Sequence, residues 1–186
     1  MKLIKKHILI LSWVAILIAT LESCDNQITF NEDTLGPYVT VCVESYQPYY
    51  NTFKLIDSLK NELKALNVET EKSFGIFYER TADRNNTKFH SIVGCILKNS
   101  VGQDSLEIIK LQRNKFMVRT IGATKSMYVR LPFEDFSTPL RANILHAIDN
   151  YIQQNNYLPI PNGINGIMEV YDGNDIIFSA EIRPSR

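Results

Sequence analysis

The sequence predicts an α+β fold built from a tandem βαββ repeat. Short runs rich in Val, Ile and aromatic residues, typical of strands, recur along the chain. Each half also holds one longer segment in which apolar residues recur every three or four positions, the periodicity of one face of a helix. Hydrophobic residues make up 45% of the 186 residues and charged residues 22%, which is the composition of a chain with one globular core.

The first half of the chain holds the first expected repeat. A strand is expected over residues 38–46, and Pro48 then marks the start of a helix. Two further strands are expected over residues 73–80 and 89–97. The apolar face of the helix is expected to consist of Phe53, Ile56, Leu59, Leu63 and Leu66.

The second repeat follows an expected hairpin at residues 107–121. Residues 125–131 alternate between apolar and polar side chains as in a strand, and Thr138 is expected to be the N-cap of a second helix, with Pro139 in its first turn. Strands over residues 166–171 and 176–182 close the chain. The apolar stripe of this helix is expected to consist of Leu140, Ile144, Ile148 and Ile152.

A single unit of this kind buries its helix and its sheet poorly. Two copies side by side can share one antiparallel sheet, because each then covers the other's open edge. We therefore expect both helices on one face of this sheet and a groove on the other face, at the seam between the repeats.

The first residues have the shape of an export signal. Three lysines precede an apolar run over residues 8–21, which is shorter than the ~20 residues that a membrane-spanning helix needs. Leu21 and Ser23 then lead to Cys24, an order that resembles the lipobox of bacterial lipoproteins. In that class of protein the cysteine is acylated and becomes the new N-terminus after cleavage.

These features divide the chain into three parts. We expect a lipoprotein-type signal peptide over residues 1–23, a tether over residues 24–36 and one domain over residues 37–186. An ordinary signal peptide or an uncleaved N-terminal anchor is the alternative. The expected location is the cell envelope, as a membrane-anchored protein on the periplasmic or outer face.

Charge and cysteine usage bear on several classes of function. The 20 basic residues balance the 20 acidic ones, so no net field favours nucleic acid or an anionic substrate. The three histidines are scattered without metal-ligand spacing, and we expect neither a metal nor a cofactor. Cys42 and Cys95 both lie in expected strands, where they are either a disulfide or two buried free thiols.

Several segments, in this order and spacing, resemble the GyrI-like (gyrase-inhibitor-like) effector-binding domain. They are residues 44–49 (ESYQPY), 75–79 (GIFYE), 129–133 (VRLPF) and 168–171 (MEVY). The resemblance runs from about residue 38 to residue 182, and it extends to the GyrI-like domain of a membrane-tethered ER-phagy receptor of animals. It implies a domain that takes a small molecule in the groove between the two repeats.

The resemblance also implies the site residues. In relatives that bind cationic aromatic compounds, a glutamate lies at the base of the groove and aromatic side chains form its walls. Glu169 matches that glutamate, and Tyr171 shares its strand face. Arg130 is expected to pair with Glu169, to accept an anionic ligand, or to lie at the rim in water. The implied ligand-binding residues are Glu169, Tyr171, Tyr128, Tyr78, Phe133 and Arg130.

Three hypotheses of function follow. The first is a membrane-anchored protein that binds a small aromatic or cationic molecule. The second is a membrane-tethered adaptor whose groove is filled by side chains and whose loops bind a protein. The third is a hydrolase in which Glu169 activates water, although no G-x-S-x-G or Cys/His arrangement supplies a second catalytic group.

Overall fold

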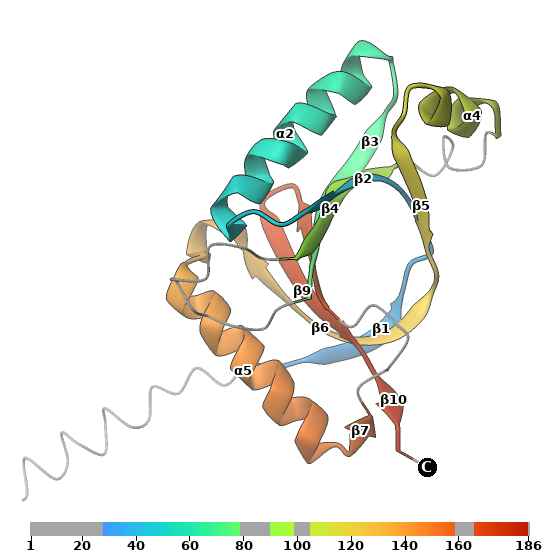
Figure 1. Cartoon of the computed structure of the whole chain (residues 1–186). Helices are drawn as coiled ribbons and strands as arrows, with labels where there is room; N and C mark the ends of the chain where they lie inside the picture. Colours follow the sequence, from blue (N-terminus) through green and yellow to red (C-terminus); the bar gives the residue numbers. More distant parts are fainter. Residues whose placement is uncertain (1–27, 79–89, 99–104, 159–165, 186) are drawn as a thin grey trace, which may run out of the picture.

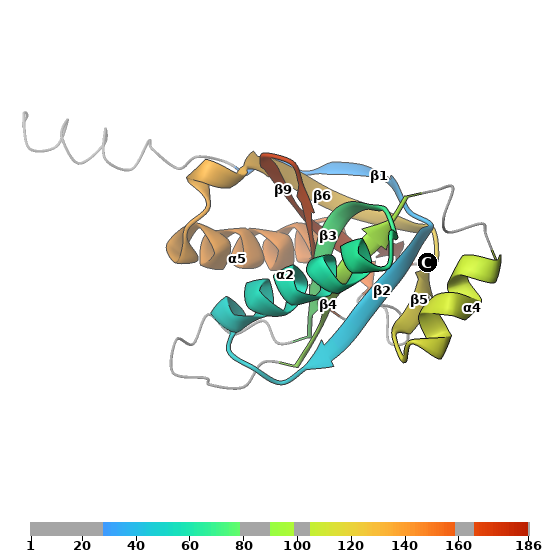
Figure 2. The same ribbon diagram turned by 90° about the horizontal axis from the view of Figure 1, so that it is seen from above.

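The computed structural model describes residues 28–78, 90–98, 105–158 and 166–185. These residues form an eight-stranded antiparallel sheet that curls, and the two long helices α2 (Tyr49–Ala65) and α5 (Thr138–Gln154) lie on one face of it (Figure 1). Figure 2 shows the same two helices on one side, with α4 (Ser105–Arg113) at the far edge beside β5. The expected α+β class and the shared face of the two helices are confirmed.

The strands follow the order β1-β6-β9-β8-β3-β4-β2-β5 across the sheet. Their bounds are β1 (Asn31–Leu35), β2 (Tyr38–Ser45), β3 (Thr70–Phe77), β4 (Ser91–Leu97), β5 (Met117–Ile121), β6 (Thr124–Pro132), β8 (Ile167–Asp172) and β9 (Asp175–Glu181). Two short strands, β7 (Tyr157–Leu158) and β10 (Arg183–Pro184), pair with each other, and the 3-10 turn η1 (Phe133–Asp135) precedes α5.

The tandem repeat is present as β2-α2-β3-β4 and β6-α5-β8-β9. The two units meet where β3 pairs with β8, and Gly75 lies opposite Glu169 at this seam. Each helix buries its expected stripe against its own half of the sheet, with Ile56 of α2 and Ile148 of α5 almost fully covered. The seam between the two units therefore runs beneath the gap between the two helices.

Two regions differ from the sequence prediction. The hairpin expected at residues 107–121 is instead α4 followed by β5, because Leu111 of α4 is fully buried against the core under α2. The segment expected to be a tether already contains β1, which pairs with β6. Phe30, just before β1, packs edge-on against Tyr151 of α5, with ring centroids 5.3 Å apart.

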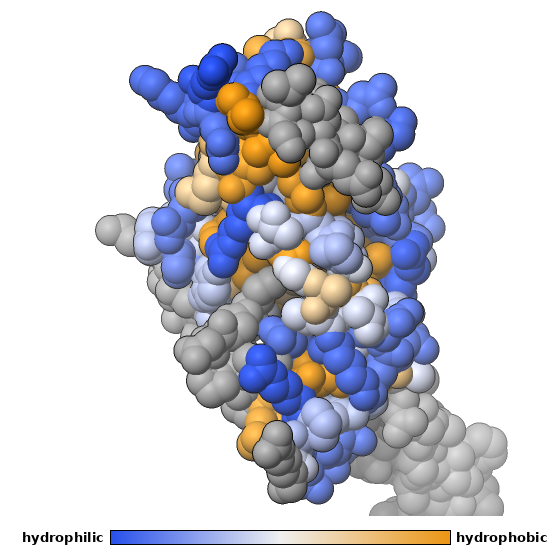
Figure 3. Space-filling model, turned by 90° about the vertical axis from the view of Figure 1, so that its right-hand side faces the viewer, coloured by the Kyte–Doolittle hydropathy of each residue, from blue (hydrophilic) through white to orange (hydrophobic). Residues whose placement is uncertain are grey.

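The face of the sheet turned away from the helices is filled by apolar side chains. Phe74, Ile76, Met168 and Val170 pack there inside the curl of the sheet. The pocket found on this side among the described residues has a volume of about 20 Å³. Figure 3 shows that the outer surface on this side is mostly hydrophilic, with apolar groups gathered in its upper half.

Cys42 and Cys95 are buried free thiols. They lie on the paired strands β2 and β4 but point to opposite faces, since Cys42 packs with Phe74 inside the curl and Cys95 packs with Leu59 under α2. Burial raises the pKa of the Cys95 thiol to about 11. Of the two alternatives, the structure has the pair of free thiols.

The expected signal peptide and Cys24 lie outside the described residues. Among the residues that are described, no helix is both long enough and apolar enough to cross a membrane.

Candidate functional site

The carboxylate of Glu169 is the most enclosed acidic group of the described fold. Its side chain is 0% exposed, in the middle of β8 and beneath the two helices. Oε1 accepts a hydrogen bond from Nε of Arg141 at 2.8 Å, and Oε2 accepts from the hydroxyls of Tyr49 at 2.6 Å and Tyr171 at 2.9 Å. A buried charge is costly unless it is paired and hydrogen-bonded, and here both conditions are met.

Arg141 supplies the positive charge of this network. It lies in the first turn of α5 and is 7% exposed. Its guanidinium carbon lies 4.4 Å from the centre of the Tyr49 ring and 5.2 Å from that of Phe77, which are cation–π distances. The cation is therefore held by a carboxylate and two aromatic rings at once.

A connected cluster of aromatic rings surrounds the ion pair. Tyr49 contacts Phe77 with ring centroids 4.9 Å apart, and Phe53 contacts Tyr171 at 5.3 Å. Phe133 forms the outer edge, because its side chain is 42% exposed. The cluster consists of Tyr49, Phe53, Phe77, Phe133, Phe136, Tyr171 and Phe178.

The two helices begin at this site. Pro48 caps α2, whose first residue is Tyr49, and Ser137 caps α5 by accepting a hydrogen bond from the backbone N–H of Leu140. The cap of α5 is thus one residue earlier than expected from the sequence. Neither helix has an acidic residue in its first turn, so neither positive end is offset by a carboxylate of its own helix.

Gly75 makes room for the aromatic floor of the site. It lies opposite Glu169 on the neighbouring strand β3. A Cβ atom at this position would lie 2.6 Å from Cε2 of Phe77, which is closer than two non-bonded carbon atoms approach each other. The missing side chain allows the Phe77 ring to fold back across the seam and to lie under Arg141.

Burial and charge keep the two tyrosines and Arg141 in one protonation state at neutral pH. Burial and the Glu169 carboxylate together raise the pKa of Tyr49 and of Tyr171 well above the usual value of a phenol. Burial, the largest single influence, would lower the pKa of Arg141, but Glu169, Tyr49 and Tyr171 together raise it. The two phenols therefore stay protonated donors, and the guanidinium stays charged.

Three of the six side chains expected at the site come together. Glu169 and Tyr171 share the face of β8 that the helices cover, and Phe133 lies against Tyr171 with ring centroids 6.3 Å apart. We expected this group on the face away from the helices. The structure places it under them, because Met168 and Val170, the apolar residues of β8, fill the inside of the curl.

The other three expected side chains lie elsewhere. Arg130 does not pair with Glu169; it binds Asp175 at 2.9 Å and Asp172 at 3.4 Å on the surface. Tyr78 stacks on His90 with ring centroids 4.5 Å apart. Tyr128 alternates along β6 with Met127 and Val129, which pack under α5, so it points to the opposite face.

Two residues of the site, Arg141 and Tyr49, were not expected from the sequence. Tyr49 directly follows Pro48 in one of the segments that carry the GyrI-like resemblance. Arg141 falls on the buried stripe of α5, three residues before Ile144 and seven before Ile148. A charged residue on an apolar stripe was the signal for a buried partner.

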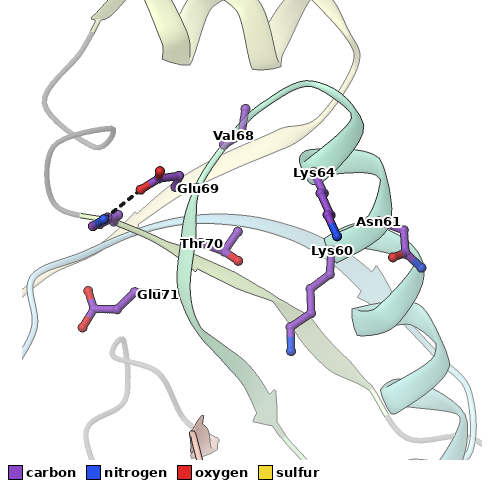
Figure 4. Close-up of a pocket in the computed structure, with 8 residues that line it drawn as sticks. Lys60, Asn61, Lys64, Val68, Glu69, Thr70 and Glu71 are labelled. Atoms are coloured by element: carbon purple, nitrogen blue, oxygen red, sulfur yellow. Dashed lines mark hydrogen bonds and ion pairs between the residues drawn. The ribbon is translucent and has the colours of Figure 1, made fainter.

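An open pocket of the described residues lies at the other end of α2 and holds none of these groups. It has a volume of about 840 Å³ between the last turns of α2 and the start of β3. Figure 4 shows Lys60 and Lys64 on the helix side and Glu69 on the other side. Glu69 forms an ion pair with Lys98 at 2.8 Å. This groove is open to solvent and has no aromatic wall, so its size does not make it the better candidate site.

Comparison with known proteins shows the fold. The sequence matches no protein-family profile and no curated protein. The structure is similar to the C-terminal domain of EcmrR, with a TM-score of 0.60 and 13% identity over 84% of this chain and 98% of that domain. It is also similar to EcmrR in a DNA complex, with a TM-score of 0.63 and 13% identity over 99% of this chain and 68% of that one.

A third similar structure is SAV2435 bound to tetraphenylphosphonium. Its TM-score is 0.52, with 10% identity over 83% of this chain and 94% of that one. At such identities the likeness concerns the fold alone, and it agrees with the fold that the GyrI-like resemblance implies.

Proposed function

We propose that this domain binds a small aromatic molecule at the seam between its two repeats. The observation that carries the proposal is a carboxylate that is 0% exposed, held among seven aromatic rings where the two helices begin. Aromatic walls with a few converging polar groups are the usual lining of a small-molecule site. The fold of SAV2435, which is bound to the aromatic cation tetraphenylphosphonium, supports an aromatic small molecule as the class of ligand.

Entry to this site requires the outer rings to move. Phe53 and Phe136 are half-buried and Phe133 is exposed, whereas Phe77 and Phe178 are fully buried. The outer rings have fewer neighbours to hold them, so they are the ones that a ligand can displace or stack upon. A ligand would then contact the tyrosines and Arg141 below.

The aromatic packing also favours the second candidate, an adaptor whose groove is filled. A ligand screen separates the two. The full chain is titrated with neutral and charged single-ring and two-ring aromatics, and binding is followed by NMR and by the rise in melting temperature that a ligand of the folded state causes. Saturable binding supports the proposal. If no compound binds, the adaptor takes its place.

A matched pair of variants, Phe133→Ala and Met117→Ala, shows where on the domain the ligand binds. Both side chains are exposed, at 42% and 45%, but Met117 lies on β5 at the far edge of the sheet. Phe133→Ala should weaken a ligand found in the screen by about tenfold, as expected for the loss of one aromatic contact. Met117→Ala should leave the affinity unchanged, and equal losses would place the ligand elsewhere.

We propose no reaction at this site. A general base needs an oxygen within reach of water or substrate, and both oxygens of Glu169 accept hydrogen bonds from protein side chains. In this arrangement the carboxylate acts as the structural centre of the site.

We also propose that Cys24 carries a lipid that holds the domain at a membrane of the cell envelope. The support is the order of Leu21, Ser23 and Cys24 after the apolar run. Cys24→Ser should move the protein from the membrane fraction to the soluble fraction. Retention of this variant after a high-salt wash would replace the lipid anchor by an uncleaved N-terminal segment.

A further inference from the structure

The buried ion pair has a consequence for the charge of the ligand. A carboxylate enclosed by aromatic rings is the usual receptor for an organic cation. In this chain the place next to the carboxylate is already filled, because Nε of Arg141 is bound to Glu169 and the guanidinium carbon lies over Tyr49 and Phe77. The protein thus supplies its own cation.

Arg141 still has donors to offer. Only its Nε takes part in a hydrogen bond, and the described residues provide no acceptor for Nη1 or Nη2. The side chain is 8% exposed, and the fully buried side-chain atoms without a partner among the described residues are the hydroxyls of Ser73 and Ser91, so both Nη atoms keep a contact with solvent. A largely buried guanidinium with two nitrogens at the edge of the site can donate them to an acceptor group on a ligand.

The surroundings favour an acceptor over a donor. The charge of Glu169 is balanced by Arg141 and further satisfied by the hydroxyls of Tyr49 and Tyr171. The positive ends of α2 and α5 have no acidic residue in their first turns. The nearby acidic residues Glu134 and Asp135 of η1 are exposed, so solvent screens them, and the two helix ends favour an anion or a neutral acceptor over a cation at the Nη donors.

We propose that the site takes aromatic molecules that carry an acceptor group, such as a carboxylate or sulfonate, and that Arg141 excludes organic cations of the same shape. This inference rests on the proposed function and assigns the charge of its ligand. Arg141 is the specificity-determining residue, and its Nη donors bind the acceptor group while Phe53, Phe133 and Tyr171 contact the ring.

The test uses three soluble probes that share a phenyl ring and a tetrahedral head. They are benzenesulfonate, which is anionic, benzenesulfonamide, which is neutral, and phenyltrimethylammonium, which is cationic. Dissociation constants are measured by NMR titration of the full chain. The wild type should bind benzenesulfonate at least about tenfold more tightly than phenyltrimethylammonium, with benzenesulfonamide between them, because like charges at close range are strongly disfavoured.

Two variants complete the test. Arg141→Met keeps the length of the side chain but leaves the charge of Glu169 unbalanced, so it should reverse the order and bind phenyltrimethylammonium most tightly. Arg141→Met/Glu169→Gln removes both charges and should bind the three probes alike. If the single variant does not fold, the wild type and the double variant still decide the question.

The outcomes separate this inference from the proposed function. A wild type that binds phenyltrimethylammonium as tightly as benzenesulfonate, or more tightly, overturns the role of Arg141 while leaving an aromatic site in place. A chain that binds none of the probes in any variant, and none of the screened aromatics, overturns the proposed function and this inference together.

Discussion

The two ends of α2 hold ion pairs of the same length in opposite surroundings. Arg141 lies 2.8 Å from Glu169 near the first turn, and Lys98 lies 2.8 Å from Glu69 beyond the last. The first pair is 8% and 0% exposed, and the second is 59% and 69% exposed. The N–O distance is the same in the two ion pairs, so the difference in their contributions to stability comes from their exposure to water.

Exposed ion pairs are screened and cost side-chain entropy, whereas breaking a buried pair leaves a charge that nothing solvates. The comparison also explains why the larger hollow is the poorer candidate site. The groove beside Lys98 is wide because solvated side chains line it, while the seam at Glu169 is tight because a buried charge must be surrounded by partners.

The largest effect is expected from Arg141→Met. It leaves the Glu169 carboxylate buried without its counter-ion, so the free energy of unfolding should fall by about 3–5 kcal/mol. Urea denaturation measures the loss. The matched control is Lys98→Met, which breaks the exposed pair of equal length and should leave the unfolding curve where it is.

The double variant Arg141→Met/Glu169→Gln tests whether the loss of stability comes from the unpaired charge of Glu169. With both charges gone, no buried ion is left unpaired, and the double variant should be more stable than Arg141→Met alone by about 1–4 kcal/mol. If removal of the second charge adds a further loss, Glu169 does not depend on Arg141 for its charge balance.

A smaller loss is expected from removal of one hydroxyl. Tyr171→Phe deletes the hydrogen bond to Oε2 of Glu169 and should lower the free energy of unfolding by about 1.5–3 kcal/mol, as for bonds to charged groups. Tyr46→Phe is the control, because the Tyr46 hydroxyl binds Glu44 with the same spacing of two residues on an exposed strand end. A comparable loss in the control would show that burial is not the cause.

The smallest effect is expected from titration of the buried phenols of Tyr49 and Tyr171. It is measurable at alkaline pH and not at neutral pH. The folded-state pKa of Tyr171 lies above the unfolded value of about 10, so its contribution to stability is complete below pH 10 and is lost as the pH rises further. Each phenol with a raised pKa should steepen the fall of the free energy of unfolding with pH by up to about 1.4 kcal/mol per pH unit. Urea denaturation between pH 9 and 11 should show a shallower decline for Tyr171→Phe than for the exposed-site control Tyr50→Phe.

The sequence predicted the elements that repeat and missed those that do not. The spacing of apolar residues and the strand-like runs were sufficient to predict α2, α5 and the central strands, because each of these elements has a regular buried face. β1 was missed since its residues, NEDTL, are mostly polar and exposed, as is common for an edge strand. α4 was missed because the helix has only nine residues and, among its described side chains at residues 108–113, Leu111 alone is fully buried, which leaves little periodic signal.

The site was predicted in part for a similar reason. Strand parity placed Tyr171 beside Glu169, and both are in the hydrogen-bonded network. Parity alone does not say which face the helices cover, and Arg130 was therefore expected near Glu169. The true partner, Arg141, is 28 residues away on another element, a pairing that tertiary packing creates and local pattern does not encode.

The place of β1 sets a limit on the reach of the domain. β1 is hydrogen-bonded along its length to β6, and Glu32 within it accepts from Tyr151 of α5. The chain between Cys24 and Asn31 spans at most about 25 Å when fully extended. If Cys24 carries the proposed lipid, β1 lies within that distance of the membrane surface, and a ligand of the proposed site would be taken from the layer next to the lipid headgroups.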